Sequence, residues 1–342
     1  MNFVIVREFP AHDLDYAWRD CLARAASPSH YNSPEYFLVP HFAGKRPFAI
    51  LAKDGSKVVG VLTGLHEGTQ LQCGLMSRPQ ICIDPAADVH ATTDALTRGL
   101  LAEGKRAELV SVFAWKNESL PFERFGFRYK EFEGNVVLDL TQGAEALFKQ
   151  FTKDRRRNIR FAEKNGVDIG LATTTEDVAA CYDVYVQWRQ TQRKKVQGTQ
   201  TAFEVFAEAA KLANRIMFVA RIGGKPIAIN IFRFFPGGLF ESASNYSLDE
   251  YLHLKSNELL QWKGIEWACS HGLKRHSLGG AHGFLRRFGG TVVPVVRYRL
   301  DRSLLRRHDV RDAVLKLSRK TVHHMPPALS KSILRVLGRP SH

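Results

Sequence analysis

Three side chains in the second part of the sequence are of the types that acid–base chemistry needs. Glu241 lies on a predicted strand, and Tyr246 and His253 follow in the segment that leaves this strand. A carboxylate or an imidazole can take a proton from a reacting group, directly or through water, and a phenol can give one to a leaving group. We predict Glu241 or His253 as general base and Tyr246 as general acid. The alternatives are an outward strand carboxylate and an ordinary loop histidine.

A phosphate-binding position is predicted directly after these residues, where a helix begins. Lys255, Ser256 and Asn257 start a helical pattern, and the backbone N–H groups of a helix start lack partners within the helix. Such N–H groups bind phosphates readily. The sequence has no glycine-rich phosphate signature here, so a Ser or Asn helix cap beside a solvated lysine is the alternative.

Two basic clusters predict contacts with an anionic substrate. The clusters are residues 153–164 and residues 193–195, and the side chains we select from them are Arg157, Arg160 and Lys194. Arginine binds phosphate and carboxylate through two parallel hydrogen bonds. The same arginines could instead contact the backbone of a tRNA, or form a solvated face.

The elements that position these groups occur twice along the chain. Residues 50–61 read ILAKDGSKVVGV and residues 218–229 read FVARIGGKPIAI, at a constant offset of 168. Each copy predicts two strands joined by a tight turn, because Asp-Gly and Gly-Gly tolerate positive φ. A third strand, a helix and a further strand follow in each copy: 70–75, 92–103 and 108–113 in the first, 239–245, 255–271 and 273–278 in the second. We infer an internal duplication.

This order of elements predicts an α+β fold with two domains. The chain has no G-x-G-x-x-G, no P-loop and no G-x-S-x-G motif in the required context, which argues against dinucleotide enzymes, P-loop enzymes and serine hydrolases. We place the domains at residues 1–140 and 141–301, with one long helix at 144–165 and a basic, helical tail at 302–342.

Composition narrows the cellular context. The 342 residues carry a formal charge of +15, which favours anionic partners. The five cysteines are scattered without metal-ligand spacing, so we expect reduced thiols, no metal site and a cytoplasmic protein. We expect neither a signal peptide nor a membrane span. The tail has ten Lys or Arg against two Asp, with apolar residues between them, and is a candidate for peripheral contact with an anionic inner membrane.

The second domain resembles the FemAB-like and CelD-like acyltransferases of the GNAT superfamily. The resemblance covers about residues 145–300, and the first domain mainly through the repeat. Its segments are RNIRFAEKNGV (157–167), GKPIA (224–228), LLQWKGIEWA (259–268), HGL (271–273) and FLRRFGG (284–290). The last is similar to the family's Phe-Lys-x-x-Phe-Gly, but Leu285 stands where the family often has lysine. Arg286 is adjacent, and we include it among the substrate-binding candidates.

The resemblance implies two tandem GNAT-type domains, each with a mixed, mostly antiparallel sheet flanked by helices. It also implies acyl transfer to an amino group of a cell-envelope sugar or peptide precursor, which includes lipid-linked ones. The expected donor is acyl-CoA. The alternative donor is aminoacyl-tRNA, which would make the protein a peptidoglycan cross-bridge transferase; Leu285 weakens that alternative because leucine cannot polarise a carbonyl. A third possibility is a non-catalytic protein that binds nucleic acid or membrane surfaces on a GNAT scaffold.

Overall fold

The fold is described here from a computed structural model, in which residues 1–39, 45–116, 120–192 and 200–322 are described. We call residues 1–140 the first half and residues 141–301 the second half. The first half contains β1 (Asn2–Val6), α1 (His12–Arg24), β2 (Lys45–Asp54), β3 (Lys57–Glu67), β4 (Gln70–Cys73), β5 (Ile81–Ile83), α2 (Val89–Glu103), β6 (Leu109–Trp115) and β7 (Arg128–Asp139).

The second half repeats this order after two extra helices. It contains α3 (Ala144–Gln150), α4 (Lys153–Lys164), β8 (Val167–Leu171), α5 (Thr175–Thr191), α6 (Phe203–Ala210), β9 (Arg215–Ile222), β10 (Lys225–Phe234), β11 (Leu239–Ser247), α7 (Ser256–Ser270), β12 (Arg275–Ser277), α8 (Gly283–Arg286) and β13 (Thr291–Asp301). Every strand and helix that the internal repeat predicts is present. The predicted α+β class is confirmed.

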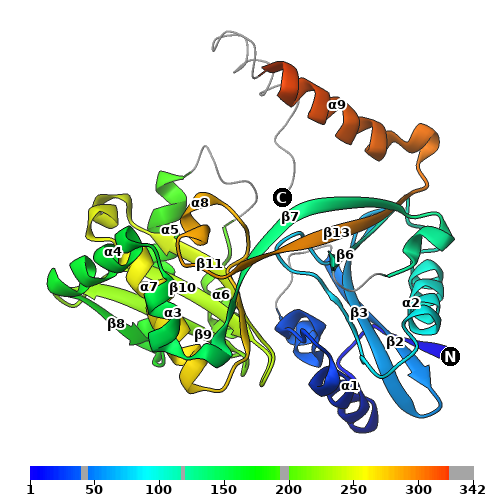
Figure 1. The fold of residues 1–342 in the computed structure, drawn as a ribbon, viewed down its shortest axis with the longest axis horizontal. Helices are drawn as coiled ribbons and strands as arrows, with labels where there is room; N and C mark the ends of the chain where they lie inside the picture. The colour runs from blue at the N-terminus through cyan, green and yellow to red at the C-terminus, as the bar shows by residue number, and fades with distance from the viewer. Residues whose placement is uncertain (40–44, 117–119, 193–199, 323–342) are drawn as a thin grey trace.

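The two halves share one continuous sheet because they exchange their last strands. The strand order is β1-β2-β3-β4-β6-β13-β7-β12-β11-β10-β9-β8, and β5 pairs with β3. β13 from the second half pairs with β6 of the first, and β7 from the first half pairs with β12 of the second. Figure 1 shows β7 and β13 running side by side as an arch between the two bodies. The boundary predicted at 140 falls just after β7, and the domain limits stay predictions.

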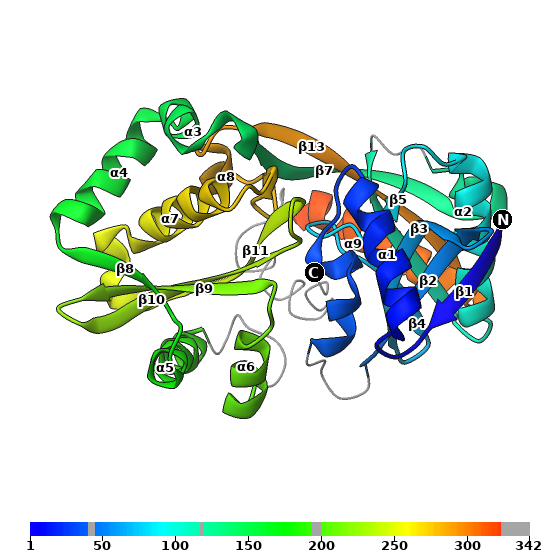
Figure 2. The ribbon, with the colours of Figure 1, turned by 90° about the horizontal axis from the view of Figure 1, so that it is seen from below.

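Helices cover both faces of the sheet in the second half. α3, α4 and α7 lie on one face and α5 and α6 on the other (Figure 2). α7 packs tightly on β10, because a Cβ atom at Gly264 would stand 2.5 Å from Phe232 Cζ. This close contact fixes the height at which α7 begins relative to the strands, and the start of α7 borders the site described below.

The single helix predicted over 144–165 is wrong. It breaks at Phe151 and Thr152, which have extended backbone conformations. The Phe151 ring is buried against Trp262 and Phe288, and the Thr152 hydroxyl accepts a hydrogen bond from the N–H of Arg155 as the cap of α4. Burying that ring turns the chain, and the cap starts a new helix.

The tail begins with a helix, α9 (Arg307–Val322). Asp312 pairs with Arg297 and Arg299 on β13, and Asp309 pairs with Arg128 on β7. These ion pairs attach the start of α9 to the strand arch. Residues 323–342, the rest of the predicted tail, lie outside the described residues, and membrane contact through the tail stays a prediction. Among the described residues, no helix has the length and apolar composition needed to cross a membrane.

Candidate active site

A cavity opens where β11 and β12 separate. The two strands pair in parallel from Leu239–Arg275 to Glu241–Ser277 and then diverge. β11 continues beside β10 to Ser247, while the other chain turns away at Gly279, whose φ is +86°. The cavity has a volume of about 340 Å³, within the range of small-molecule sites. Its walls are Ser77, Arg78, Asn230, Ser242, Ala243, Ser244, Asn245, Asn257, Gln261, Leu278, Gly279, His282, Phe284 and Leu285.

The start of α7 faces this cavity. The helix begins at Ser256, after Lys255 in a left-handed conformation with φ of 60°, and no side chain caps it. Asn257 lines the cavity, and its side chain accepts a hydrogen bond from the Ser247 hydroxyl. The first N–H groups of α7 therefore lack side-chain partners and carry the positive end of the helix dipole. A phosphate at this end would be stabilised.

A buried hydrogen-bond network holds the wall under the cavity. Gln261 Nε2 donates to His276 Nε2 at 2.6 Å, and His276 Nδ1 donates to the carbonyl of Phe240 at 2.9 Å. Gln261 Oε1 accepts from Asn230 and from the Ser242 hydroxyl, each at 3.3 Å. Burial lowers the pKa of His276 to about 4, so its imidazole is neutral at pH 7, as this donor–acceptor pattern requires.

A row of polar side chains crosses the other face of the sheet. Arg215 on β9, Arg233 on β10, Glu241 on β11 and Ser277 on β12 are successive cross-strand neighbours. Both arginine Nε atoms, Glu241 Oε2 and Ser277 Oγ are buried without a hydrogen-bond partner among the described residues. Buried polar atoms are normally paired, so this row is a candidate binding surface for a polar ligand.

Burial of the row shifts two pKa values. Burial raises the pKa of Glu241 to about 7, although the positive charges of Arg78 and Arg233 oppose the shift. Burial, together with the neighbouring Arg233, lowers the pKa of Arg215 to about 10. A carboxyl group with a pKa near 7 is half ionised at neutral pH, which suits a general base.

The first half supplies one wall of the site. Its segment 74–80 reaches the second half, where Arg78 lines the cavity and donates to the carbonyl of Ala243 at 3.2 Å. Tyr31 lies between Arg78 and Arg233, whose guanidinium carbons are 5.1 and 5.0 Å from its ring centre. The site therefore needs both halves, and one arginine of each half contacts the same ring.

The residues predicted for catalysis and donor binding do not all meet here. Glu241 belongs to the polar row, Asn257 lines the cavity, and Ser256 is buried at the helix start. Tyr246 packs against Tyr185 and Trp188 under α5 and does not line the cavity. His253 is exposed, with Nδ1 donating to the carbonyl of Glu250. Lys255 provides the left-handed turn before α7, and its ammonium is not among the cavity walls.

The predicted substrate-binding arginines point elsewhere. Arg157 is exposed and pairs with Asp154, and Arg160 lies over the Phe148 ring at 5.6 Å. Arg286 pairs with Glu133. None of these three lines the cavity, and Lys194 lies outside the described residues.

Sequence reasoning missed the arginine of α4 that supports the site. Arg155 is 1% exposed, pairs with Glu258 on α7 at 2.9 Å and donates to the carbonyl of Phe284 at 2.7 Å. Its guanidinium stacks on Phe284, a cavity wall, at 4.1 Å. The spacing along the helix could have indicated this burial, because Arg155 lies on the same face of α4 as the apolar Ile159 and Ala162. Arg78, Arg215, Arg233, Gln261 and His276 were also missed.

Comparison with known proteins supports the resemblance. Residues 149–286 match the family described as acetyltransferase (GNAT) domain. The structure is similar to FemX, with 11% identity, a TM-score of 0.62, and 87% of this chain and 97% of the other covered. It is similar to L-PGS from Bacillus licheniformis, with 13% identity, a TM-score of 0.59, and coverage of 91% and 98%.

A further similar structure is a tandem GNAT protein from the clavulanic acid biosynthesis pathway, with 13% identity, a TM-score of 0.54, and coverage of 89% and 99%. No curated protein matches the sequence. The family match covers the half that contains the cavity, and the structural likeness extends over both halves with their shared sheet. Residues 149–286 therefore match a GNAT acetyltransferase domain, and the two halves together have the fold of the tandem GNAT protein and of FemX.

Proposed function

We propose that the protein transfers an acyl group from acyl-CoA to an amino group of an anionic cell-envelope precursor, a sugar or a peptide. One observation carries this proposal. The opening between β11 and β12 begins directly after the Glu241–Ser277 pair, with the uncapped start of α7 on the cavity face of the sheet and the ionisable carboxyl of Glu241 on the other face. GNAT proteins typically use acyl-CoA, and the tandem GNAT relative is described with reference to AcCoA.

The donor occupies the opening between the strands in this proposal. Its pantetheine arm enters the cavity beside Ser242 and Leu278, and its phosphates lie at the N–H groups of Ser256 and Asn257. The free N–H groups of β11 beyond Glu241 face the opening, because β12 no longer pairs there. Such donors can hold the thioester carbonyl and stabilise the oxyanion that forms on it.

The acceptor approaches from the side of the polar row. Its amine gives a proton to Glu241 and attacks the thioester carbon. The C–N bond forms, the C–S bond breaks, and the thiolate of CoA leaves and takes a proton from solvent. Glu241 fits the role of base because its pKa is about 7 and its Oε2 has no partner among the described residues. The positioning of two substrates can itself lower the barrier by about 7–11 kcal/mol.

The anionic part of the acceptor binds the arginines of the row. Arg215 and Arg233 are half-buried and their Nε atoms are buried without a partner among the described residues, so a carboxylate or phosphate from the acceptor would stabilise them. These two arginines and Arg78 replace Arg157 and Arg160 as our substrate-binding residues. The tRNA-dependent alternative is weaker, because Leu285 lines the cavity and presents no ammonium group there.

The test is a thermal-shift titration with CoA, a series of acyl-CoAs and charged tRNA, each at low and high salt. A ligand at about a hundred times its dissociation constant adds roughly 2.7 kcal/mol of stability. We expect one acyl-CoA to raise the melting temperature at both salt concentrations. A shift with charged tRNA alone would make aminoacyl-tRNA the donor. A tRNA shift that disappears at high salt, with no response to any CoA, would leave the non-catalytic binding protein.

A further inference from the structure

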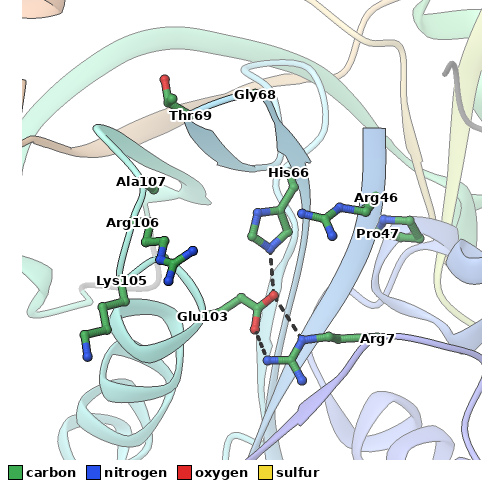
Figure 3. Close-up of a pocket in the computed structure, with 11 residues that line it drawn as sticks. Arg7, Arg46, Pro47, His66, Gly68, Thr69, Glu103, Lys105, Arg106 and Ala107 are labelled. Carbon is green, nitrogen blue, oxygen red and sulfur yellow. Dashed lines mark hydrogen bonds and ion pairs between the residues drawn. The ribbon is translucent and has the colours of Figure 1, made fainter. Parts of the chain in front are cut away.

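A second cavity lies in the first half, away from the opening between β11 and β12. Its volume is about 700 Å³, and it lies where β2 and β3 meet the C-terminal end of α2. Figure 3 shows charged side chains that line it: Arg7 after β1, Arg46 on β2, His66 on β3, and Glu103, Lys105 and Arg106 at the end of α2, where Lys105 extends away from Glu103. None of these residues lines the cavity described above.

Glu103 organises one wall of this cavity. Its side chain is 5% exposed, and Oε2 accepts from Arg7 at 2.6 Å while Oε1 lies 2.6 Å from His66 Nε2. Burial opposes its ionisation, yet the hydrogen bonds from Arg7 and His66 hold the pKa of Glu103 below its usual value. The Phe48 ring packs edge-on to His66 at 5.2 Å. The carboxylate therefore fixes Arg7 and the imidazole at the cavity.

The walls carry a large excess of positive charge. Four fixed cations face the cavity, and Glu103 is the one carboxylate among its lining residues, which leaves three positive charges uncompensated. The nearby carboxylates are engaged elsewhere, because Glu67 pairs with Lys45 and Glu108 with Arg307. Arg46, Lys105 and Arg106 form no ion pair with any residue that the structure describes. All four cations are on exposed residues, and an anion bound in the cavity would offset their mutual repulsion.

Two ordinary explanations do not account for this charge. A helix C-terminus favours cations, which explains Lys105 and Arg106, but Arg7 follows β1 and Arg46 lies on β2. The chain is basic throughout, but most of the duplicated positions in the second half are not. At the offset of 168, Arg46, His66, Glu103 and Lys105 correspond to Asn214, Phe234, His271 and Leu273, and Arg106 corresponds to Lys274. The charge belongs to this cavity in the first half.

We propose that this cavity binds the diphosphate group of a soluble organic molecule. A diphosphate carries about the charge that the walls lack, and the guanidinium groups of Arg46 and Arg106 can each bind its oxygens with two hydrogen bonds. Pro47 and Ala107 form an apolar part of the wall, and the volume exceeds that of a diphosphate alone, so it leaves room for an organic group. The inference is independent of the acyl-transfer site.

The test measures the affinity of inorganic pyrophosphate and of uridine diphosphate by calorimetry at constant ionic strength. The variant is R46A/R106A, and the control is K53A/R124A, which removes two charges from the first half outside the cavity. We expect micromolar binding to the wild type, about tenfold weaker binding to the variant, and no change in the control. The thermal shift with CoA should be the same in all three proteins.

Three results would overturn the proposal. These are no binding to the wild type below millimolar concentration, equal weakening in the variant and the control, or displacement of pyrophosphate by an equal concentration of sulfate. The first two remove the site, and the third shows an anion surface without preference for diphosphate. Because CoA is measured separately, failure here is distinguishable from failure of the acyl-transfer proposal. The melting temperature without ligand checks that R46A/R106A is folded.

Discussion

The two halves differ most in the strand that borders the donor opening. In the second half β11 is continuous from Leu239 to Ser247 and pairs with β10 along its length. In the first half the equivalent strand is interrupted, because β4 and β5 pair with opposite ends of β3 and residues 74–80 loop out between them. Gln80 fills the gap: its side chain accepts from the N–H of Gly74 at 2.7 Å, and its backbone N–H donates to Phe113.

The helices that follow these strands, α2 and α7, differ in how their N-terminal ends are capped. α2 is capped by Asp88, whose carboxylate accepts from the N–H groups of His90 and Ala91 at 2.9 and 3.0 Å. α7 follows Lys255 and has no side-chain cap. In the first half a carboxylate of the chain itself occupies the place where a donor phosphate would bind. The second half leaves that place open.

The comparison indicates that the two halves of the duplicated fold have different roles. A loop of a few residues and one acidic cap close the donor site of the first half. The same loop carries Arg78 into the site of the second half. In the proposed function the first half therefore serves as a wall of the site, and the second half carries the chemistry.

The largest effect that the comparison predicts is on Glu241. Glu241→Gln should lower kcat about a hundredfold or more, because the amide cannot accept the amine's proton. In the wild type the rate should rise with pH through about 7, as Glu241 ionises. The variant should lose this limb of the pH–rate profile, measured with the acyl-CoA that the thermal shift selects. A variant profile that keeps the limb would show that another group is the base.

Glu241→Gln should lower the rate but raise the stability of the folded protein at high pH. The pKa of Glu241 is raised in the folded protein, so its protonated form is favoured by folding, and the free energy of unfolding falls as pH rises from about 4.5 to about 7. Glu241→Gln removes this penalty, which is a few kcal/mol at most. Urea denaturation at pH 5 and pH 8 should show the variant gaining stability at pH 8 only. Equal changes at both pH values would contradict a buried carboxyl with a pKa near 7.

Substitutions of two buried glutamines, Gln261 in the second half and Gln80 in the first, test which half binds the donor. Gln261→Ala leaves His276, Asn230 and Ser242 without a shared partner, and Gln80→Ala leaves the N–H of Gly74 unpaired. We expect losses of about 3 and about 2 kcal/mol in the free energy of unfolding. Only Gln261→Ala should also weaken CoA binding, measured by calorimetry. Equal loss of CoA affinity in Gln80→Ala would place a donor in the first half.

Most of the fold could be predicted because the hairpin pattern occurs twice in the sequence. The paired segments around Gly55 and Gly223 both became hairpins, and the helices after them lie where the apolar pattern indicates. Two features could not be predicted. The first is the exchange of β7 and β13 between the halves, because the local sequence of a strand does not indicate whether it pairs within its own half or with the other half. The break at Phe151 depends on rings of α7 and of the segment after α8 that are distant in sequence.

The sequence indicated candidate residues that lie close together in the chain, and it did not indicate those that the fold brings in from distant segments. Glu241 and Asn257 follow from a strand and a helix start that are adjacent in the chain. Arg78 comes from a loop far away in sequence, and Arg215 joins the row only through strand register. Arg157 and Arg160 were chosen as members of a charged run, but the run is helical and presents them to solvent. Only Arg155 of that run turns inward.

Arg78 tests whether the first half serves the second. Its positive charge lowers the pKa of Glu241, so Arg78→Ala should move the midpoint of the pH–rate profile to higher pH and lower the rate at pH 7 several-fold. Arg78→Lys keeps the charge and should keep the midpoint. The neighbouring cavity wall Ser77→Ala is the neutral control. An unchanged midpoint in Arg78→Ala would mean that the loop packs against the second half without tuning its base.

The last prediction concerns the two helix starts. Asn257→Asp gives α7 the acidic start that α2 already has, so it should weaken CoA binding about tenfold by repelling the donor phosphates, and the helix dipole should leave stability unchanged or slightly higher. Asp88→Ala removes the cap of α2 and should cost about 1 kcal/mol of stability without changing CoA binding. Calorimetry with CoA and urea denaturation measure both variants. If Asn257→Asp leaves CoA affinity unchanged, the phosphates do not lie at α7, and the difference between the helix starts concerns stability alone. If Asp88→Ala strengthens CoA binding, the first half still has a donor site that its own carboxylate closes.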